Sequence, residues 1–128
     1  MSQITVLVVD DEPIIRMDLA DLVRDSGYIV LEAADADEAI TLLEAHGAIR
    51  ILVTDIEMPG SMNGLKLAAA VRKRWPPVAI IVTSGRILPA NAELPSATSF
   101  LGKPYSCATM TAALVEAAET VSRIHHAA

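Results

Sequence analysis

Acidic, hydroxyl and basic residues follow four short apolar runs of the chain, and together they could bind a metal ion and a phosphoryl group. These residues are Asp10, Asp11, Asp55, Thr83, Ser84 and Lys103. Carboxylate ligands without histidine or cysteine favour a hard cation such as Mg²⁺ or Mn²⁺. A carboxylate can also attack phosphorus, while an ammonium and hydroxyls bind phosphoryl oxygens. The residue types therefore predict a metal-dependent phosphoryl site.

The apolar runs must bring these residues together. They cover residues 6–9, 51–54, 79–82 and 100–102 and are continuous rather than alternating. This pattern is typical of parallel strands with helices on both faces of their sheet. Ligand sites in such sheets lie beyond the carboxyl ends of the strands. Because three carboxylates within a few Å repel one another, at least one pKa should rise unless a cation lies among them.

Helical patterns alternate with the runs, which predicts a parallel sheet built from βαβ units. A first helix is expected to begin at Pro13 and to end near Gly27. Its inward stripe would contain Ile15, Leu19, Leu22 and Val23. After a strand over residues 28–33, Asp35 or Asp37 would cap a second helix. A third helix would end before Pro76-Pro77.

The last helix carries apolar residues at Cys107, Met110, Leu114, Ala117, Val121 and Ile124. This spacing fits a coiled-coil seam, but the run is shorter than three heptads, which favours packing on the core. Cys107, the single cysteine, excludes an internal disulfide and is expected to be a small buried hydrophobic residue.

Before this helix, residues 85–96 contain two prolines and no full amphipathic pattern. They predict an irregular loop with at most a short helix. We expect one domain over residues 3–124 and a C-terminal tail over residues 125–128.

The composition narrows the classes of function. The formal net charge of −6 disfavours direct binding to nucleic acid or to an anionic membrane. No apolar stretch approaches the ~18 residues that a membrane span needs. The N-terminus has no basic segment typical of a signal peptide, and a lone cysteine suits a reducing compartment. A cytoplasmic protein is therefore expected.

Four motifs, VLVVDDEP, LVTDIEMPG followed by NGL, IIVTSG and FLGKPY, resemble the receiver domain of two-component response regulators. The resemblance covers essentially the whole chain. It implies an α/β, flavodoxin-like, doubly wound sheet of five parallel strands in the order 2-1-3-4-5, with helices on both faces. The fourth helix, over residues 85–96, would be shortened or irregular.

The resemblance implies roles for the residues that bind the phosphoryl group. Asp55 matches the phosphoacceptor and Lys103 the phosphoryl-binding lysine. Thr83 matches the switch hydroxyl, and Ser84 would join it in binding phosphoryl oxygens. Phe100 lies at the aromatic position that moves inward when the threonine turns, and it lacks the hydroxyl of the commoner tyrosine.

The resemblance also implies a Mg²⁺ site, with Mn²⁺ as a substitute. Asp11 and Asp55 would bind the ion, Asp10 would do so largely through water, and Glu57 would contribute its backbone carbonyl. The Lys103-Pro104 bond is expected to be cis. The side chain of Glu57 adds an acid beside the site, and we hypothesise that it slows anionic phosphodonors or tunes hydrolysis.

Two further departures from the family pattern concern loops. The turn over residues 60–64 is one residue longer than usual and has Asn63 where Asp is frequent. The segment 85–96 puts in doubt the common dimer face, which the fourth helix helps to form, so a monomer or weak dimer is expected.

The function implied is a signalling switch, not an enzyme with turnover. A histidine kinase or a histidine phosphotransfer protein would phosphorylate Asp55, and another protein would receive the output. The alternative is a pseudo-receiver that binds partners without phosphorylation. A haloacid-dehalogenase-type phosphatase would need DxDx[TV] after the first strand, where this chain has Asp10-Asp11-Glu12-Pro13. A nucleotide or flavin binder would need a phosphate-binding loop there.

Overall fold

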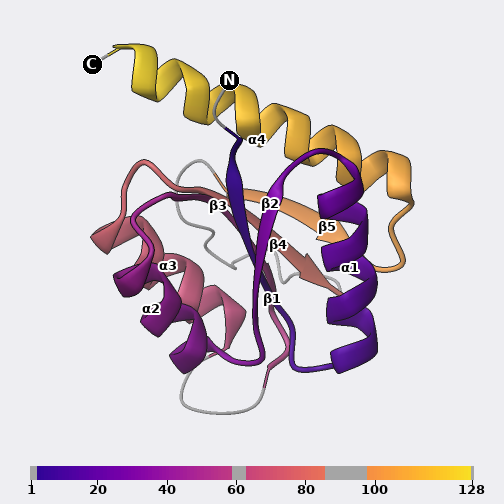
Figure 1. The fold of residues 1–128 in the computed structure, drawn as a ribbon. Coiled ribbons are helices and arrows are strands. Elements are labelled where there is room, and N and C mark those ends of the chain that lie inside the picture. Colours follow the sequence, from indigo (N-terminus) through magenta and orange to yellow (C-terminus); the bar gives the residue numbers. More distant parts are fainter. Residues whose placement is uncertain (1–2, 59–62, 86–97, 128) are drawn as a thin grey trace.

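Five parallel strands form one sheet in the order β2-β1-β3-β4-β5 (Figure 1). The computed structural model describes residues 3–58, 63–85 and 98–127, with only the backbone for 124–127. The strands are β1 (Thr5–Val9), β2 (Ile29–Ala33), β3 (Ile49–Asp55), β4 (Ala79–Ser84) and β5 (Thr98–Gly102). The predicted strand order is confirmed.

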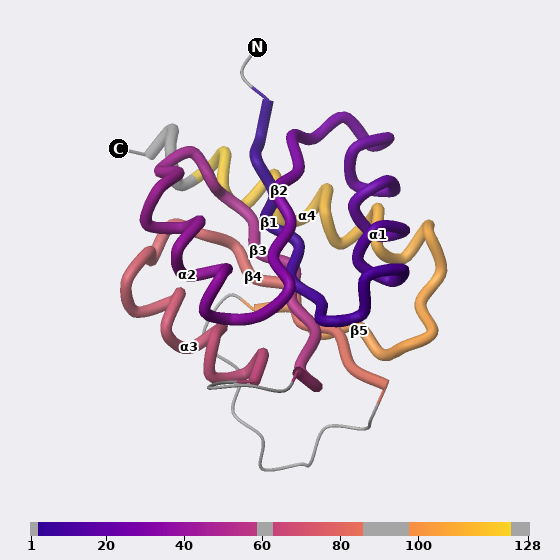
Figure 2. Tube along the Cα trace, turned by 60° about the horizontal axis from the view of Figure 1, so that its bottom comes forward, coloured from indigo at the N-terminus to yellow at the C-terminus, as the bar shows by residue number. Residues whose placement is uncertain are grey.

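Helices cover both faces of this sheet, as predicted. They are α1 (Pro13–Asp25), α2 (Ala36–Ala45), α3 (Gly64–Arg74) and α4 (Cys107–Ala127). Helices α2 and α3 pack on one face, and α1 and α4 pack on the other (Figures 1 and 2). Residues 86–96 of the predicted short or irregular fourth helix and residues 60–62 of the predicted turn lie outside the described residues.

Alternate residues of each strand enter two separate cores, which explains the continuous apolar runs. In β1, Leu7 and Val9 pack with α2 and α3, whereas Val6 and Val8 pack with α1 and α4. All four side chains are buried. Because both faces of β1 are buried, residues 6–9 are all apolar, and the next polar side chain, Asp10, appears where the strand ends.

The local signals at helix ends are largely as predicted. Pro13 is the first residue of α1, and Gly27 beyond its end has a φ of +100°, a left-handed conformation that suits glycine. The side chain of Asp35 accepts a hydrogen bond from the Glu38 N–H and caps α2. The inward position predicted for Ile15 is wrong, because this residue lies in the first turn of α1 and contact with the core begins at Leu19.

Helix α4 packs its apolar stripe on the sheet and not on another chain. Met110, Leu114, Ala117 and Val121 are all buried in the core shared with α1, which confirms the core interpretation for these four residues. Cys107 is exposed, contrary to the prediction, because it is the first residue of the helix and the buried face starts one turn later. The helix continues to Ala127, through residues 125–127 of the predicted tail. Within the described ranges, no helix combines the length and apolarity that crossing a bilayer would require.

Candidate phosphoryl and metal site

The carboxyl ends of four strands bring the predicted residues to one edge of the sheet. Asp10 follows β1, Asp55 ends β3, Ser84 ends β4 and Lys103 follows β5. The register places Asp55 directly beside Thr83 on the neighbouring strand. The expected convergence of acidic, hydroxyl and basic groups is therefore present.

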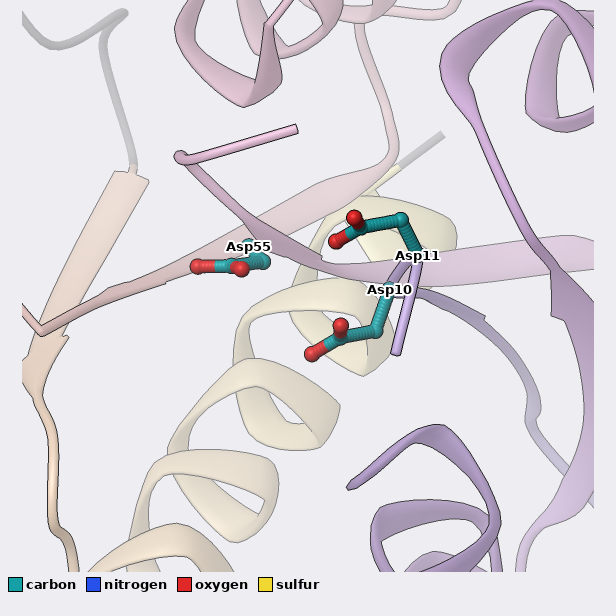
Figure 3. Close-up of side chains that lie close together, drawn as sticks. All are labelled: Asp10, Asp11 and Asp55. Atoms are coloured by element: carbon teal, nitrogen blue, oxygen red, sulfur yellow. The ribbon is translucent and has the colours of Figure 1, made fainter. Parts of the chain in front are cut away.

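Three carboxylates form the centre of this edge (Figure 3). Asp10, Asp11 and Asp55 each offer an oxygen, and these oxygens lie within 4.8 Å of one another. Asp10 and Asp55 are 2% and 7% exposed, so water screens their charges poorly. The buried Oδ1 of Asp55 makes no well-aligned hydrogen bond among the described residues, and its near neighbour is the ammonium of Lys103. An oxygen-only set of three clustered carboxylates fits a Mg²⁺ ion.

Lys103 is the cation that faces this cluster. Its Nζ lies 3.3 Å from Oδ1 of Asp55 and 3.7 Å from Oδ2 of Asp10. The Lys103 N–H donates to the carbonyl of Ser84 at 2.7 Å, which fixes the residue against the end of β4. The following bond, Lys103-Pro104, is cis as expected. Because one ammonium faces three carboxylates, negative charge remains in excess and a divalent cation would balance it.

The environment of Asp55 disfavours its ionised form. Burial raises its pKa from 3.8 to about 6. The Lys103 ammonium opposes this rise, whereas a hydrogen bond shared with Glu57 and the negative charge of Asp10 add to it. Asp55 therefore stays ionised at neutral pH only against a substantial desolvation cost.

The side chain of Glu57 also enters the site, in addition to the backbone role implied for it. The hydroxyl of Ser84 donates a hydrogen bond to Oε1 of Glu57. Burial would raise the pKa of Glu57, but the hydrogen bonds from Ser84 and from protonated Asp55 outweigh it and lower the pKa below its usual value. Glu57 is thus the ionised partner of the pair, and it lies directly beside Asp55.

Thr83 and Phe100 occupy positions consistent with the switch roles implied for them. Thr83 is buried at 2% exposure, and its carbonyl accepts the Ile56 N–H at 2.8 Å. Phe100 is partly buried and packs against the core between the sheet and helices α2 and α3. The two residues lie on adjacent strands, where Phe100 pairs with Val82, the residue before Thr83. Their movement remains a prediction.

Comparison with known proteins identifies the family of this chain. The family model of the response regulator receiver domain matches residues 6–115. The chain belongs to this family. Receiver domains are signalling modules of two-component systems, they bind Mg²⁺ at an acidic pocket, and they interact with histidine kinases or phosphotransfer proteins.

Individual relatives agree with this membership. The receiver domain is 37% identical over 112 residues to the transcriptional regulatory protein PdtaR of Mycobacterium tuberculosis, covering 85% of the chain and 54% of PdtaR. It is 36% identical over 123 residues to the sensor kinase CckA of Brucella abortus, covering 90% of the chain and 12% of CckA. The chain thus spans about half of PdtaR and a small part of CckA.

A solved structure gives the same fold. The response regulator TrrA of Thermotoga maritima, described as a complex with Mg²⁺ and BeF, superposes with a TM-score of 0.80 at 26% identity. The match covers 88% of this chain and 97% of TrrA.

The sequence pattern gave no indication of a role for Arg16, which stabilises the loop that carries Asp10 and Asp11. Its Nη1 donates to the carbonyl of Asp10 at 2.9 Å, and its Nε lies 3.3 Å from Oε1 of Glu32 on β2. The guanidinium therefore ties the end of β1 to the neighbouring strand. The signal was an arginine one turn into a helix that follows an acidic loop, which is too common to identify a role.

Two other residues at the site had no assigned role. A Cβ on Gly64 would lie 2.0 Å from the carbonyl oxygen of Asp55, so only glycine lets α3 begin this close to β3. Tyr105 is partly buried; burial and the negative charges of Asp10 and Asp55 raise its pKa. Both residues were visible in the motifs, but their contacts depend on how the elements pack.

We predict that Gly64→Ala destabilises the domain by about 1–3 kcal/mol, because the added methyl group must displace the backbone of Asp55. Urea unfolding measures this change. Gly47→Ala is the matched control, since a Cβ there meets nothing within 4 Å. We expect the control to stay within about 0.5 kcal/mol of wild type. Equal effects of the two substitutions would contradict the close approach.

The raised pKa of Asp55 predicts how stability depends on pH without metal. The folded state holds this proton up to a pH of about 6 and the unfolded chain only up to about 3.8, so stability falls as pH rises between these values. Asp55→Asn removes the ionised group and should stabilise the domain by about 1–3 kcal/mol at neutral pH. Urea unfolding in EDTA should show this gain vanishing below about pH 4. A gain that does not change with pH would refute the assignment.

Proposed function

We propose that this receiver domain accepts a phosphoryl group on Asp55, in the presence of Mg²⁺ or Mn²⁺, and signals by binding another protein. The observation that carries the proposal is the position of Asp55. Its buried carboxylate lies between the Lys103 ammonium and the carboxylates of Asp10 and Asp11 at one edge of the sheet. This arrangement offers one nucleophile together with the groups that neutralise a phosphoryl group.

The proposed reaction transfers the phosphoryl group from a phosphohistidine of a kinase or phosphotransfer protein. An Asp55 oxygen attacks phosphorus, the bond from phosphorus to the histidine nitrogen breaks, and the released imidazole takes a proton from solvent. Lys103 neutralises one phosphoryl oxygen, and the Thr83 and Ser84 hydroxyls donate to others. Asp10, Asp11, Asp55 and the Glu57 carbonyl would hold the metal ion, which neutralises phosphoryl charge when bound. Asp55 is modified once, so the domain acts as a switch and not as a catalyst.

An exposed apolar patch next to the site supports a protein as the phosphodonor. Ile14, Ile15 and Met17, in the first turns of α1, are 73%, 40% and 57% exposed. This helix begins directly after the loop that carries Asp10 and Asp11. A donor protein must bring its phosphohistidine to Asp55, so its surface would cover this patch, and apolar side chains suit such contact.

The alternative is an interaction module that works without phosphorylation. The carboxyl of Glu57 beside Asp55 favours this alternative, because it adds negative charge where a phosphoryl group must arrive. A direct measurement of phosphorylation separates the two functions.

Intact-protein mass spectrometry with acetyl phosphate and Mg²⁺ tests the proposal. We expect a mass gain of one phosphoryl group, no gain with EDTA, and no gain for Asp55→Asn. Asp21→Asn, an exposed acid on α1, serves as the matched control and should behave as wild type. If neither acetyl phosphate nor a phosphorylated histidine kinase labels the wild-type protein, the phosphoacceptor function is wrong and the pseudo-receiver alternative holds.

The exposed apolar patch on α1 leads to a second prediction, which concerns the donor protein. The double substitution Ile14→Ser and Met17→Ser should slow transfer from a phosphohistidine protein by about tenfold, because apolar contact with the donor is lost. Labelling by acetyl phosphate should not change, since a small donor does not need the patch. Val115→Ser, on an exposed position of α4, is the control surface variant. Equal loss with both donors would show that the substitutions act on the site itself.

A further inference from the structure

The contact between Glu57 and Ser84 links the phosphoacceptor to the end of β4, and phosphoryl transfer as proposed above does not use it. We infer that Glu57 is a latch: its carboxylate holds the Ser84 hydroxyl in the resting domain and must release it before Asp55 can keep a phosphoryl group. The latch would slow labelling by small anionic donors. This inference rests on the proposed function of Asp55.

The Ser84 hydroxyl has one proton to donate, and in the resting domain that proton goes to Oε1 of Glu57. Ser84 is only 2% exposed, so water is a poor alternative partner for the hydroxyl. Its position at the end of β4, directly after Thr83, puts it beside the acceptor strand. If the hydroxyl donates to a phosphoryl oxygen, it can no longer donate to Glu57. The two bonds are therefore mutually exclusive.

Electrostatic repulsion between the Glu57 carboxylate and a phosphoryl group on Asp55 adds to this exclusion. Glu57 follows Asp55 by two residues, and its carboxylate accepts the hydrogen bond of Ser84 at the end of the strand beside the acceptor. A phosphorylated side chain carries about −1.5 to −2 charges, which an adjacent carboxylate repels in a poorly solvated site. Glu57 is partly exposed, whereas Asp55 and Ser84 are buried. Glu57 is thus the member of the cluster that can turn toward water.

The latch predicts how the domain discriminates between donors. A small anionic donor arrives with its charge beside a fixed Glu57 and brings no other contact that moves it. A donor protein covers the edge of the sheet and makes many contacts, which can stabilise the conformation with Glu57 turned away. Removing Glu57 should therefore increase labelling by acetyl phosphate more than transfer from a phosphohistidine protein.

The test measures labelling rates of Asp55 with saturating Mg²⁺ for wild type, Glu57→Ala, Ser84→Ala and the double variant. We expect Glu57→Ala to label about tenfold faster with acetyl phosphate. Ser84→Ala alone should slow labelling about threefold, because the freed Glu57 only partly offsets the lost phosphoryl contact. In the Glu57→Ala background, the same serine substitution should slow labelling about tenfold, since only the lost contact remains.

Two controls separate the latch from a general effect. Glu57→Gln keeps an acceptor for Ser84 but removes the charge, and it should label faster than wild type and slower than Glu57→Ala. Glu119→Ala removes one charge at an exposed position of α4 and should leave the labelling rate unchanged. Urea unfolding of each variant checks that it is folded, and Glu57→Gln replaces Glu57→Ala if the alanine variant is not.

The outcomes distinguish the latch from the function on which it rests. If wild type is labelled but Glu57→Ala labels at the same rate, the latch is wrong and Asp55 remains the acceptor. Serine substitutions with the same effect in both backgrounds would also overturn the latch. If no variant is labelled by either donor, both the proposed function and the latch fail.

Discussion

Repulsion among three clustered carboxylates is the constraint on which the rest of this site depends. Asp10, Asp11 and Asp55 hold oxygens within 4.8 Å of one another, and two of these residues are almost fully buried. Free side chains would separate in water. The parallel strands β1 and β3 keep them together, because their hydrogen-bonded register and the two apolar cores fix the backbone at the carboxyl edge. Core stability thus maintains an electrostatically unfavourable arrangement, as is common at functional sites.

The groups around the cluster either reduce the repulsion among the carboxylates or hold the backbone in place against it. Lys103 neutralises part of the charge, and Arg16 holds the Asp10 carbonyl so that the acidic loop cannot move away. Gly64 allows α3 to begin against the backbone of Asp55, which confines this residue further. A divalent cation would satisfy the remaining charge. The site therefore favours a ligand that brings positive charge, and the proposed phosphorylation would need such compensation.

Membership of the receiver-domain family accounts for the sheet and the acidic cluster, and the hydrogen bond between Glu57 and Ser84 adds a further contact beside them. The hydrogen bond between them connects the segment after β3 to the end of β4 through side chains, close to Asp55. Thr83 precedes Ser84 in sequence and pairs with Asp55 in the register of β3 and β4. The proposed acceptor at the end of β3 thus lies beside the proposed latch and the expected switch threonine at the end of β4.

The sheet and the convergence of the site follow from the amino-acid pattern alone. Continuous apolar runs require strands buried on both faces, and parallel strands must present their carboxyl ends at the same edge, so Asp10, Asp55 and Lys103 had to meet. The contacts between side chains at this edge follow from the packing of the folded domain. The bond from Ser84 to Glu57, the approach of Gly64 to Asp55 and the exposure of Cys107 depend on rotamers and on the distances between packed elements. These quantities come from residues far apart in the chain, and no local pattern encodes them.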